Sequence, residues 1–547
     1  MDVNSRDRWR VWTPLLFSLV LVLGMVLGFN LRDSLRNKRD IGDVILRNDR
    51  LEEIIDLVNE KYVDTVNNNV LYKDAVAGIL KSLDPHTVYI PAEDLQGVND
   101  DLDGGFSGIG VEFSIMQDTI AVTAVLDNSP AAGAGVLPGD QIIKVGDSVV
   151  AGVNITEDRI VHLLKGKQHT KVYVTLMRMP DSLKQLSITR DIIPIYSIDA
   201  AIMLDEVTGY IKINRFSATT FTEFSKALKQ LQGLGAKQLV LDLRGNPGGY
   251  LDAASSVADA FLDNNKMIVY TQGVHSQKTE YRAEDKGVFE GGKLVVLVDE
   301  SSASASEILA GAIQDWDRGV IAGRRTFGKG LVQEQYDLPG GSALRLTIAK
   351  YYTPSGRCIQ RSFAKGKEAY MEDFEKRFES DELLGTDTTH NADTTRFYTA
   401  HRRVVYGGGG ITPDIFVPYD TARYSAALST MLLSEELKTA IWSYYIRNRE
   451  ELNYKTIADF ERSFDGAEEI RGGFLARLTA DKRKGAVREL SRPADADFFD
   501  LQVKAQMARI LFHDNGYYSI IVKEDNAVGK ALEVMGGNEY SKIVGGN

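Results

Sequence analysis

The sequence predicts a mixed α/β protein that is built from several domains. Between about residues 182 and 425, short apolar strands alternate with helix-like segments, which is the pattern of an α/β core. With 547 residues the chain is too long for one ordinary domain. A hydrophobic fraction of 44% with 26% charged residues is typical of a globular protein rather than a disordered one.

The first element, within residues 1–40, is an uncharged run from Val11 to Phe29. A helix needs about 20 apolar residues to cross a bilayer core, and this run has 19. Three arginines precede it and Trp9 and Trp12 suit the membrane interface, but basic residues also follow it, so charge alone leaves the orientation open. A cleaved signal peptide is the alternative, although no small-x-small site follows Phe29. We expect an uncleaved transmembrane anchor, with a cytoplasmic stub before it and the remaining chain outside the cytoplasm.

The next segment, residues 41–99, has a helical pattern. Apolar residues from Ile41 to about Glu93 recur at spacings compatible with 3.6 residues per turn. We therefore expect a helical segment ahead of the first β-rich unit.

A small β-domain is predicted from about residue 100 to 180. Strands are expected at Thr119–Val125, Gln141–Val145 and Lys171–Arg178, and a helix at Glu157–Leu164. The glycine-rich opening and this order of elements resemble a PDZ domain of the protease-associated type. The resemblance implies a loop whose N–H groups bind the terminal carboxylate of a peptide that adds to the sheet edge as a strand. That loop consists of Phe106, Ser107, Gly108, Ile109 and Gly110. The alternative is a glycine-rich loop that binds no ligand.

The α/β core is predicted for residues 181–425. Its expected elements are strands at Gly209–Asn214, Gln238–Arg244, Lys293–Val298, Gly319–Gly323 and Ala343–Tyr352, and helices at Thr220–Leu231, Ala253–Leu262 and Ser306–Gln314. A charged segment from Glu368 to about Thr395 has no readable fold. Residues 426–547 are largely helical by pattern, either as a packed appendage or as a surface for dimerisation or an adaptor protein.

Two stretches carry candidate chemistry. Val295–Glu307 is an apolar strand that runs through serines and alanines into a helix, where amide N–H groups could bind an oxyanion. Thr326–Gln333 places Lys329 between two glycines among apolar neighbours. An ordinary lysine titrates near pH ~10.4, and burial can lower its pKa to roughly 7–8, within the range of a general base. Taken alone, each stretch could equally be an ordinary turn or loop.

Three blocks together resemble the carboxyl-terminal processing proteases, also called tail-specific proteases or peptidase family S41. They are Leu241–Gly249, Ser304–Asp315 and Phe327–Gln333, and the likeness extends from about Leu51 to Pro418. It implies a crotonase-like ββα core in which Ser304, rather than Ser302 or Ser306, is the nucleophile.

The resemblance also implies the partners of that serine. Lys329 is the base, 329 − 304 = 25 residues downstream, and Gln333 orients its amine. If the turn between them is helical, positions four apart share a face and the two side chains can touch. The oxyanion would be held by the N–H of Ala305 and of Gly249 or Gly248, because glycine lets the backbone approach the substrate closely.

Other functional classes fit less well. The sequence has no HExxH or CxxC motif, so we expect neither a metal nor another cofactor. A net charge of −12 argues against nucleic-acid binding, and the single Cys358 excludes a disulfide-stapled fold. None of the seven histidines lies in a recognisable catalytic block; His86 most simply fixes a turn.

We therefore expect a serine endopeptidase of the inner membrane, single-pass, whose catalytic part lies in the periplasm. Its partners would be proteins or peptides with free apolar carboxyl termini, and it could form a homo-oligomer or bind an adaptor. The rival hypothesis is a non-catalytic PDZ scaffold on a degenerate protease core. Acyl-CoA chemistry on a crotonase-like fold would leave the PDZ unit and the anchor unexplained.

Overall fold

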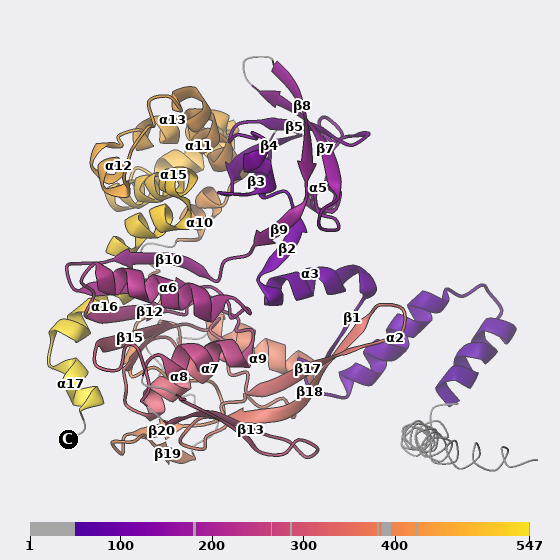
Figure 1. Cartoon of the computed structure of the whole chain (residues 1–547), viewed down its shortest axis with the longest axis vertical. Coiled ribbons are helices and arrows are strands. Elements are labelled where there is room, and N and C mark those ends of the chain that lie inside the picture. The colour runs from indigo at the N-terminus through magenta and orange to yellow at the C-terminus, as the bar shows by residue number, and fades with distance from the viewer. Residues whose placement is uncertain are drawn as a thin grey trace, which may run out of the picture. The chain divides into compact units, whose positions relative to one another are not determined.

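The computed structural model describes residues 50–116, 118–178, 182–263, 265–284, 287–379, 382–384, 395–421 and 425–545, and its chain divides into two compact units at Leu83/Asp84 (Figure 1). In the first unit, residues 50–61 are helical and α2 spans Asn68–Lys81, capped by the Asn67 side chain, which accepts the N–H of Asn69. The predicted membrane segment Val11–Phe29 lies outside the described residues. Among the described residues, no helix is both long and apolar enough to span a bilayer.

The helical pattern predicted up to Glu93 is interrupted, because the second unit begins with a turn and a strand. The Asp84 carboxylate accepts the N–H groups of His86 and Thr87 over 2.9 and 3.0 Å, a local bond pattern that competes with a helix. Strand β1 (Val88–Ile90) then pairs antiparallel with β18 (Ala343–Tyr352). Helix α3 (Ala92–Asp103) follows and leads into the predicted PDZ domain.

The predicted PDZ domain is an antiparallel sheet with one bordering helix (Figure 1). Its strands, in spatial order, are β3 (Val111–Met116), β4 (Thr119–Val125), β5 (Gln141–Val145), β7 (Lys171–Arg178) and β8 (Ser182–Thr189), with β6 (Ser148–Val149) beside β5. Its helices are α4 (Pro130–Gly133) and α5 (Glu157–Leu164). A separate antiparallel pair, β2 (Gly105–Gly108) with β9 (Asp191–Pro194), joins the chain segments that enter and leave this sheet. The structure places β4, β5, β7 and α5 at the predicted bounds, but the sheet continues past residue 180.

The α/β domain is built on a six-stranded sheet that is parallel except at one edge. The strands in order are β10 (Ile198–Met203), β11 (Thr208–Ile213), β12 (Gln238–Asp242), β15 (Lys293–Val298), β16 (Val320–Gly323) and β21 (Ile415–Phe416), with β10 antiparallel to β11. Helices α6 (Thr220–Gly233), α7 (Leu251–Asp259) and α8 (Ala305–Asp315) alternate with the strands, as predicted. The mixed α/β prediction is therefore confirmed.

Both faces of this sheet are buried, which explains its uninterrupted apolar strands. On β15, Leu294 and Val296 face a core made with α6, α7 and α8. Val295 and Leu297 face a second core, made with α16 (Asn526–Gly536) and α17 (Glu539–Val544). The carboxyl-terminal helices thus cover the face that the interspersed helices leave open.

A second, antiparallel sheet is centred on β18 and includes β1. In it, β18 pairs with β1, with β17 (Leu331–Asp337) and with β13 (Met267–Gln272), which pairs with β14 (Thr279–Arg282). The segment without a readable pattern contains helix α9 (Lys367–Glu379), and a hairpin of β19 (Arg396–Tyr398) and β20 (Val404–Tyr406) follows.

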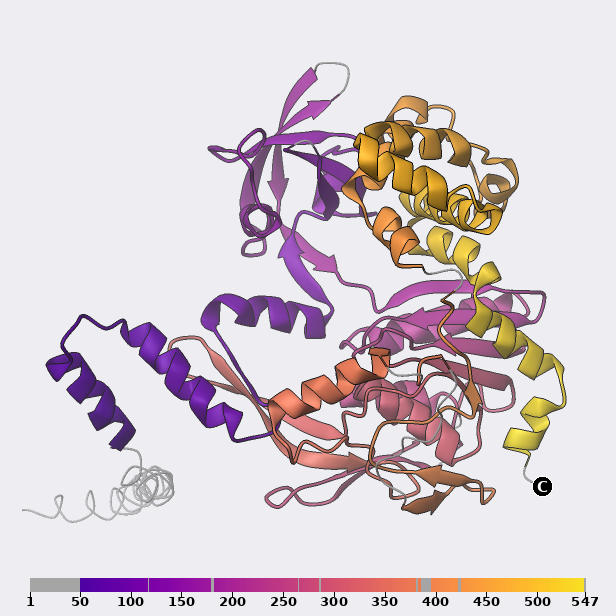
Figure 2. The same ribbon diagram turned by 180° about the vertical axis from the view of Figure 1, so that it is seen from behind.

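The helical prediction for the tail from residue 426 is confirmed (Figure 2). The helices are α10 (Ala426–Leu432), α11 (Glu435–Asn448), α12 (Ile457–Ser463), α13 (Ala467–Arg477), α14 (Ala480–Glu489) and α15 (Pro493–Ile521), followed by a 3₁₀ turn (Val522–Glu524). Non-helical backbone at Phe512 and His513 breaks α15. The part before this break packs with α10–α14 around a separate aromatic core that includes Phe460, Phe474 and Phe499.

Candidate active site

The turn between β15 and α8 presents one serine to a cavity. Ser304 immediately precedes α8 and has a positive φ of 53°, a conformation that is strained for a residue with a side chain. Such strain is common where a side chain must be held in one functional position. Ser304 is partly exposed and lines a cavity of about 740 Å³.

The two neighbouring serines have structural roles instead. The Ser302 hydroxyl donates to the carbonyl of Leu243 over 2.8 Å, and the Ser306 hydroxyl donates to the carbonyl of Asn246 over 3.0 Å. Both serines are fully buried. This difference in burial and bonding favours Ser304 among the three, and its role as nucleophile stays a prediction.

Lys329 lines the same cavity and contacts the predicted glutamine. Its Nζ donates to Oε1 of Gln333 over 2.9 Å, and Nε2 of Gln333 donates to the carbonyl of His86. Burial lowers the pKa of Lys329 from its ordinary value, and the charge of Arg345 lowers it further. The expected side-chain contact is present, but a helical turn is the wrong explanation, because Gln333 lies on strand β17. Positions an even number apart share a face of an extended chain, and the strand is irregular between Val332 and Gln333.

His86 supports Gln333 through its backbone carbonyl, while its ring Nε2 lies 3.0 Å from the hydroxyl of Tyr370 on α9. Burial lowers the pKa of His86 to about 4, and the nearby charge of Lys329 adds to this shift. A neutral, hydrogen-bonded ring in this turn agrees with a structural role.

Glu307 is a central residue of the site that the sequence reasoning missed. It is fully buried, and its Oε2 accepts the N–H groups of Ser304 and Lys329, each over 2.9 Å. Its Oε1 accepts the N–H of Gly328 over 2.7 Å and the hydroxyl of Thr326 over 2.5 Å. Burial raises the pKa of Glu307 to about 7, although these hydrogen bonds lower it in part. The signal in the sequence was a glutamate three residues after a serine that precedes a helix, the pattern of a capping box.

The structure distinguishes the two glycines that were candidates for binding the oxyanion. Gly248 is buried, and its N–H already donates to Oδ1 of Asn246 over 2.8 Å. Gly249 is exposed to the cavity, and a Cβ at its φ of 142° would lie 2.0 Å from the carbonyl oxygen of Phe216. Among the hydrogen bonds of the described residues, none uses the N–H of Gly249 or of Ala305. Gly249 therefore suits the role better than Gly248.

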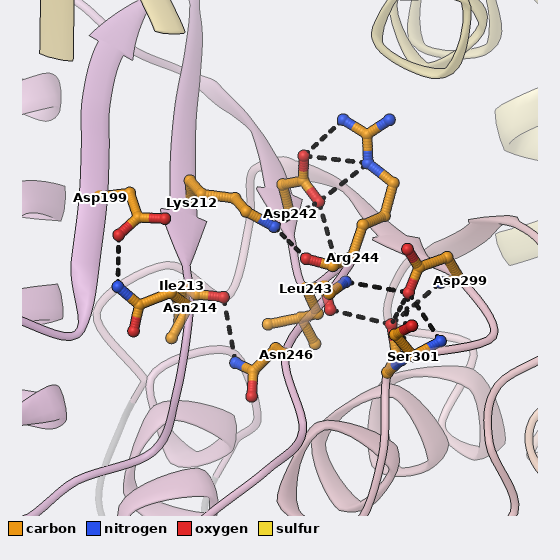
Figure 3. Close-up of polar contacts among 12 residues, drawn as sticks. Asp199, Lys212, Ile213, Asn214, Asp242, Leu243, Arg244, Asn246, Asp299 and Ser301 are labelled. Atoms are coloured by element: carbon orange, nitrogen blue, oxygen red, sulfur yellow. Dashed lines mark hydrogen bonds and ion pairs between the residues drawn. The ribbon is translucent and has the colours of Figure 1, made fainter. Parts of the chain in front are cut away.

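A buried charge network anchors the loop that carries these glycines (Figure 3). The Arg244 guanidinium turns back onto the carboxylate of Asp242, with an Nη2–Oδ2 distance of 2.6 Å, and Lys212 donates to the carbonyl of Arg244. Although burial raises the pKa of Asp242, the charges of Arg244 and Lys212 hold it well below its usual range. On its other side, Arg244 donates to both oxygens of Asp525, over 3.1 and 2.9 Å. Asp525 also caps helix α16.

The cavity brings together most of the predicted protease residues. Ser304, Lys329, Gln333, Gly248 and Gly249 all line it, and Ala305 is the first residue of α8. This arrangement places a serine, a buried amine and a glycine with an unused N–H around one space, which is what acyl transfer requires. No hydrogen bond joins Ser304 to Lys329 among the contacts of the described residues.

The residues predicted to bind the peptide's terminal carboxylate lie in the predicted PDZ domain. Phe106, Ser107 and Gly108 form strand β2 rather than a free loop, Ile109 is buried in the core of the β-sheet domain, and the carbonyl of Gly110 accepts the hydroxyl of Ser129 over 3.2 Å. These residues lie at the end of α3.

The chain matches three known families. Residues 207–366 match Peptidase family S41, residues 107–189 match the PDZ domain, and residues 428–514 match a family of unknown function.

Three of the similar proteins are named as proteases. A carboxy-terminal-processing protease of Bartonella bacilliformis is 37% identical over 57% of this chain and 72% of its own length. The carboxy-terminal processing protease CtpA of Bacillus subtilis is 34% identical over 63% of this chain and 73% of its own. Among solved structures, the photosystem II D1 C-terminal processing protease is 30% identical, covering 56% of this chain and 89% of its own, with a TM-score of 0.32.

Proposed function

Since the chain belongs to the carboxy-terminal processing proteases of peptidase family S41 and is thus a serine-type peptidase with a PDZ domain, we propose that it cuts proteins with Ser304 as the nucleophile and Lys329 as the base. One observation carries this proposal. The strained, partly exposed Ser304 and the buried amine of Lys329 line the same cavity.

The reaction begins when neutral Lys329 takes the proton of the Ser304 hydroxyl as its oxygen attacks the scissile carbonyl carbon. The N–H groups of Ala305 and Gly249 stabilise the resulting oxyanion. The Lys329 ammonium then protonates the leaving amine, and an acyl-enzyme remains on Ser304. A water molecule, deprotonated by Lys329, attacks this ester. The Lys329 ammonium then returns a proton to the Ser304 oxygen as the new carboxyl terminus is released.

The contacts of Lys329 suit this role. A lysine must lose its proton to act as a base, and burial together with the charge of Arg345 favours the neutral amine. Because Oε1 of Gln333 accepts one N–H of the amine, the side chain is held in one direction. Gln333 is in turn fixed by the carbonyl of His86.

The PDZ domain recognises the carboxyl terminus of the substrate in this proposal. The family match over residues 107–189 supports a peptide-binding function. Free apolar termini are the substrates that we infer, because a PDZ groove combines N–H donors for a carboxylate with apolar side-chain pockets.

The cellular setting is part of the same proposal. We infer that Val11–Phe29 anchors the chain in the inner membrane with the protease in the periplasm. The length and lack of charge of this run support the anchor.

The proposed domain plan is an anchor within residues 1–40, a helical segment to residue 99, the PDZ domain, the protease core to residue 425 and the helical extension to residue 547. This extension would serve as a dimer or adaptor surface, or as a packed appendage.

Incubation of residues 40–547 with a disordered protein that ends in apolar residues tests the activity. Mass spectrometry should detect fragments with the wild-type chain and none with Ser304→Ala. If neither protein releases fragments although both bind the substrate, the chain is a PDZ scaffold on an inactive protease core.

A further inference from the structure

The active-site cavity follows strand β17. Four residues of this strand line the cavity together with Ser304, namely Leu331, Val332, Gln333 and Gln335. Because Gln333 and Gln335 are two positions apart in an extended strand, their side chains lie on the same face. A substrate whose scissile bond lies at Ser304 therefore has room to run along β17.

Arg345 lies beside the far end of this wall. It is the register partner of Gln335 on the neighbouring strand β18, and it also lines the cavity (Figure 1). Its Nη2 donates to Oε1 of Gln335 over 3.0 Å, and Nε2 of Gln335 donates in turn to Oδ1 of Asn99 over 3.1 Å. A guanidinium has five N–H donors, so Arg345 is held in place with donors to spare.

The charge of Arg345 has no counter-ion among the described residues. Four charged side chains line the cavity, and two of them, Asp101 and Arg215, pair with each other over 2.8 Å. Lys329 is the proposed neutral base. Burial lowers the pKa of Arg345 from its ordinary value, and no carboxylate of the described residues forms an ion pair with it. A partly desolvated guanidinium without a carboxylate is a suitable site for an acidic ligand.

The spacing along β17 indicates which part of a substrate reaches this charge. Gln333 contacts the amine of Lys329, which acts at the scissile bond, and Gln335 contacts Arg345. These two glutamines are about 7 Å apart along the strand, at about 3.4 Å per residue. An extended substrate advances by the same distance per residue. The side chain that meets Arg345 therefore belongs to a residue two or three positions from the scissile bond.

We propose that Arg345 binds an acidic side chain of the substrate, two or three positions from the scissile bond, and thereby selects cleavage sites with a nearby Glu or Asp. The inference rests on the proposed protease function, because it adds a subsite to the same cavity. The planar guanidinium matches a carboxylate with two parallel hydrogen bonds. Arg345 thus influences which bond is cut, independently of how the carboxyl terminus of the substrate is recognised.

Cleavage of matched peptides by the full chain tests this subsite. The peptides span the cut that is mapped in the activity assay and share both ends. Each carries one Glu or one Gln at one of the three positions on either side of the bond. At a position two or three residues from the bond, kcat/KM should be about tenfold higher for Glu than for Gln, because a half-buried ion pair is stronger than an exposed one.

Variants of Arg345 assign this preference. Arg345→Met should lower the Glu/Gln ratio to about one, and Arg345→Lys should keep part of it, because the charge remains without the planar fork. Arg345→Met also removes a charge that favours neutral Lys329, but this change slows both peptides equally and leaves their ratio unaffected. Lys350→Met is the control, since it removes a positive charge from an exposed position of β18 outside the cavity and should keep the wild-type ratio.

The outcomes separate the subsite from the protease function. Equal kcat/KM for Glu and Gln at every position would refute the subsite and leave the protease function intact, and so would a Glu preference that Arg345→Met retains. If no peptide is cut, the protease function itself fails, and binding of the same peptides decides the subsite. The Glu peptide must then bind about tenfold more tightly than the Gln peptide, and Arg345→Met must abolish the difference.

Discussion

The backbone amides of Ser304 and Lys329 donate to the same oxygen, Oε2 of Glu307, each over 2.9 Å. These residues are 329 − 304 = 25 positions apart in the chain, one just before α8 and the other in the loop before β17. A single buried side chain therefore fixes the spacing between the proposed nucleophile and its base. Because Glu307 acts on the backbone and not on the substrate, it is a positioning residue.

Replacing Glu307 by Gln should lower kcat more than it changes KM. A glutamine offers one acceptor oxygen where four donors converge, and its own N–H₂ faces a donor. We expect kcat to fall by at least about tenfold and the free energy of unfolding to fall by about 1–3 kcal/mol, the cost of unsatisfied buried donors. Steady-state kinetics and urea unfolding measure both. Glu334→Gln on the exposed part of β17 is the matched control, and a wild-type kcat in Glu307→Gln would contradict the positioning role.

The pKa of Glu307, raised from 4.5 to about 7, predicts a pH dependence of stability. Between these values the native state keeps a proton that the unfolded chain releases, so the free energy of unfolding falls as pH rises through this interval. Relative to Glu307→Gln, the wild-type chain should lose stability from about pH 4.5 to 7 and then level off. Urea unfolding at four pH values between 4.5 and 8 measures the difference, and a difference that does not fall with pH would show that the native carboxylate is ionised throughout this range.

The three serines of the turn should respond differently to alanine. Ser304→Ala should abolish hydrolysis and leave the thermal unfolding temperature nearly unchanged, because Ser304 is partly exposed and lines the cavity. Ser302→Ala and Ser306→Ala should keep measurable turnover but lose about 1 kcal/mol each, since each removes a buried hydrogen bond. Activity of Ser304→Ala at the wild-type rate would rule out the nucleophile.

Lys329→Arg should be inactive although it conserves charge, because a guanidinium stays protonated at any working pH. In the wild-type enzyme, kcat/KM should rise with pH as the amine of Lys329 deprotonates, and level off below the ordinary lysine pKa of 10.5 because burial lowers this value. The measurement is a pH–rate profile with a peptide substrate. An active arginine variant would exclude the Ser–Lys dyad and return attention to the histidines.

Asp525 should couple the last helices to the glycine loop. Asp525→Asn keeps an oxygen that can cap α16 but loses the charge that faces Arg244, whereas Asp525→Ala loses both. We expect kcat to fall several-fold in both variants. The alanine variant should also have the lower melting temperature, because losing the cap costs about 1 kcal/mol of free energy of unfolding. Equal melting temperatures would show that the cap contributes nothing.

The sequence predicted the elements whose signal is local. Strands such as Lys293–Val298 stand out because both faces are buried, so every residue after Lys293 is apolar. Ser304, Lys329 and Gln333 were identified from motifs, and the structure brings all three to one cavity. Their roles stay predictions.

Other features depend on partners far away in the chain. Strand β1 has three residues, and only its pairing with β18, more than 250 positions later, distinguishes it from the helical pattern around it. The local sequence does not show that Glu307 is buried, because its donors Gly328 and Lys329 lie on a later loop. Asp525 likewise gives no signal until Arg244 is placed beside it.

The late position of α16 and α17 has a consequence for biosynthesis. The last strand of the core sheet ends at Phe416, yet the helices that cover one face of that sheet contribute residues from Tyr518 onward. A ribosome that has already made all six strands thus still holds a chain with a bare apolar surface. The PDZ domain, contiguous in sequence, can fold early, whereas the protease must wait for its final helices. Translation order therefore delays the assembly of the active site until the helices that cover this face of the sheet have been made.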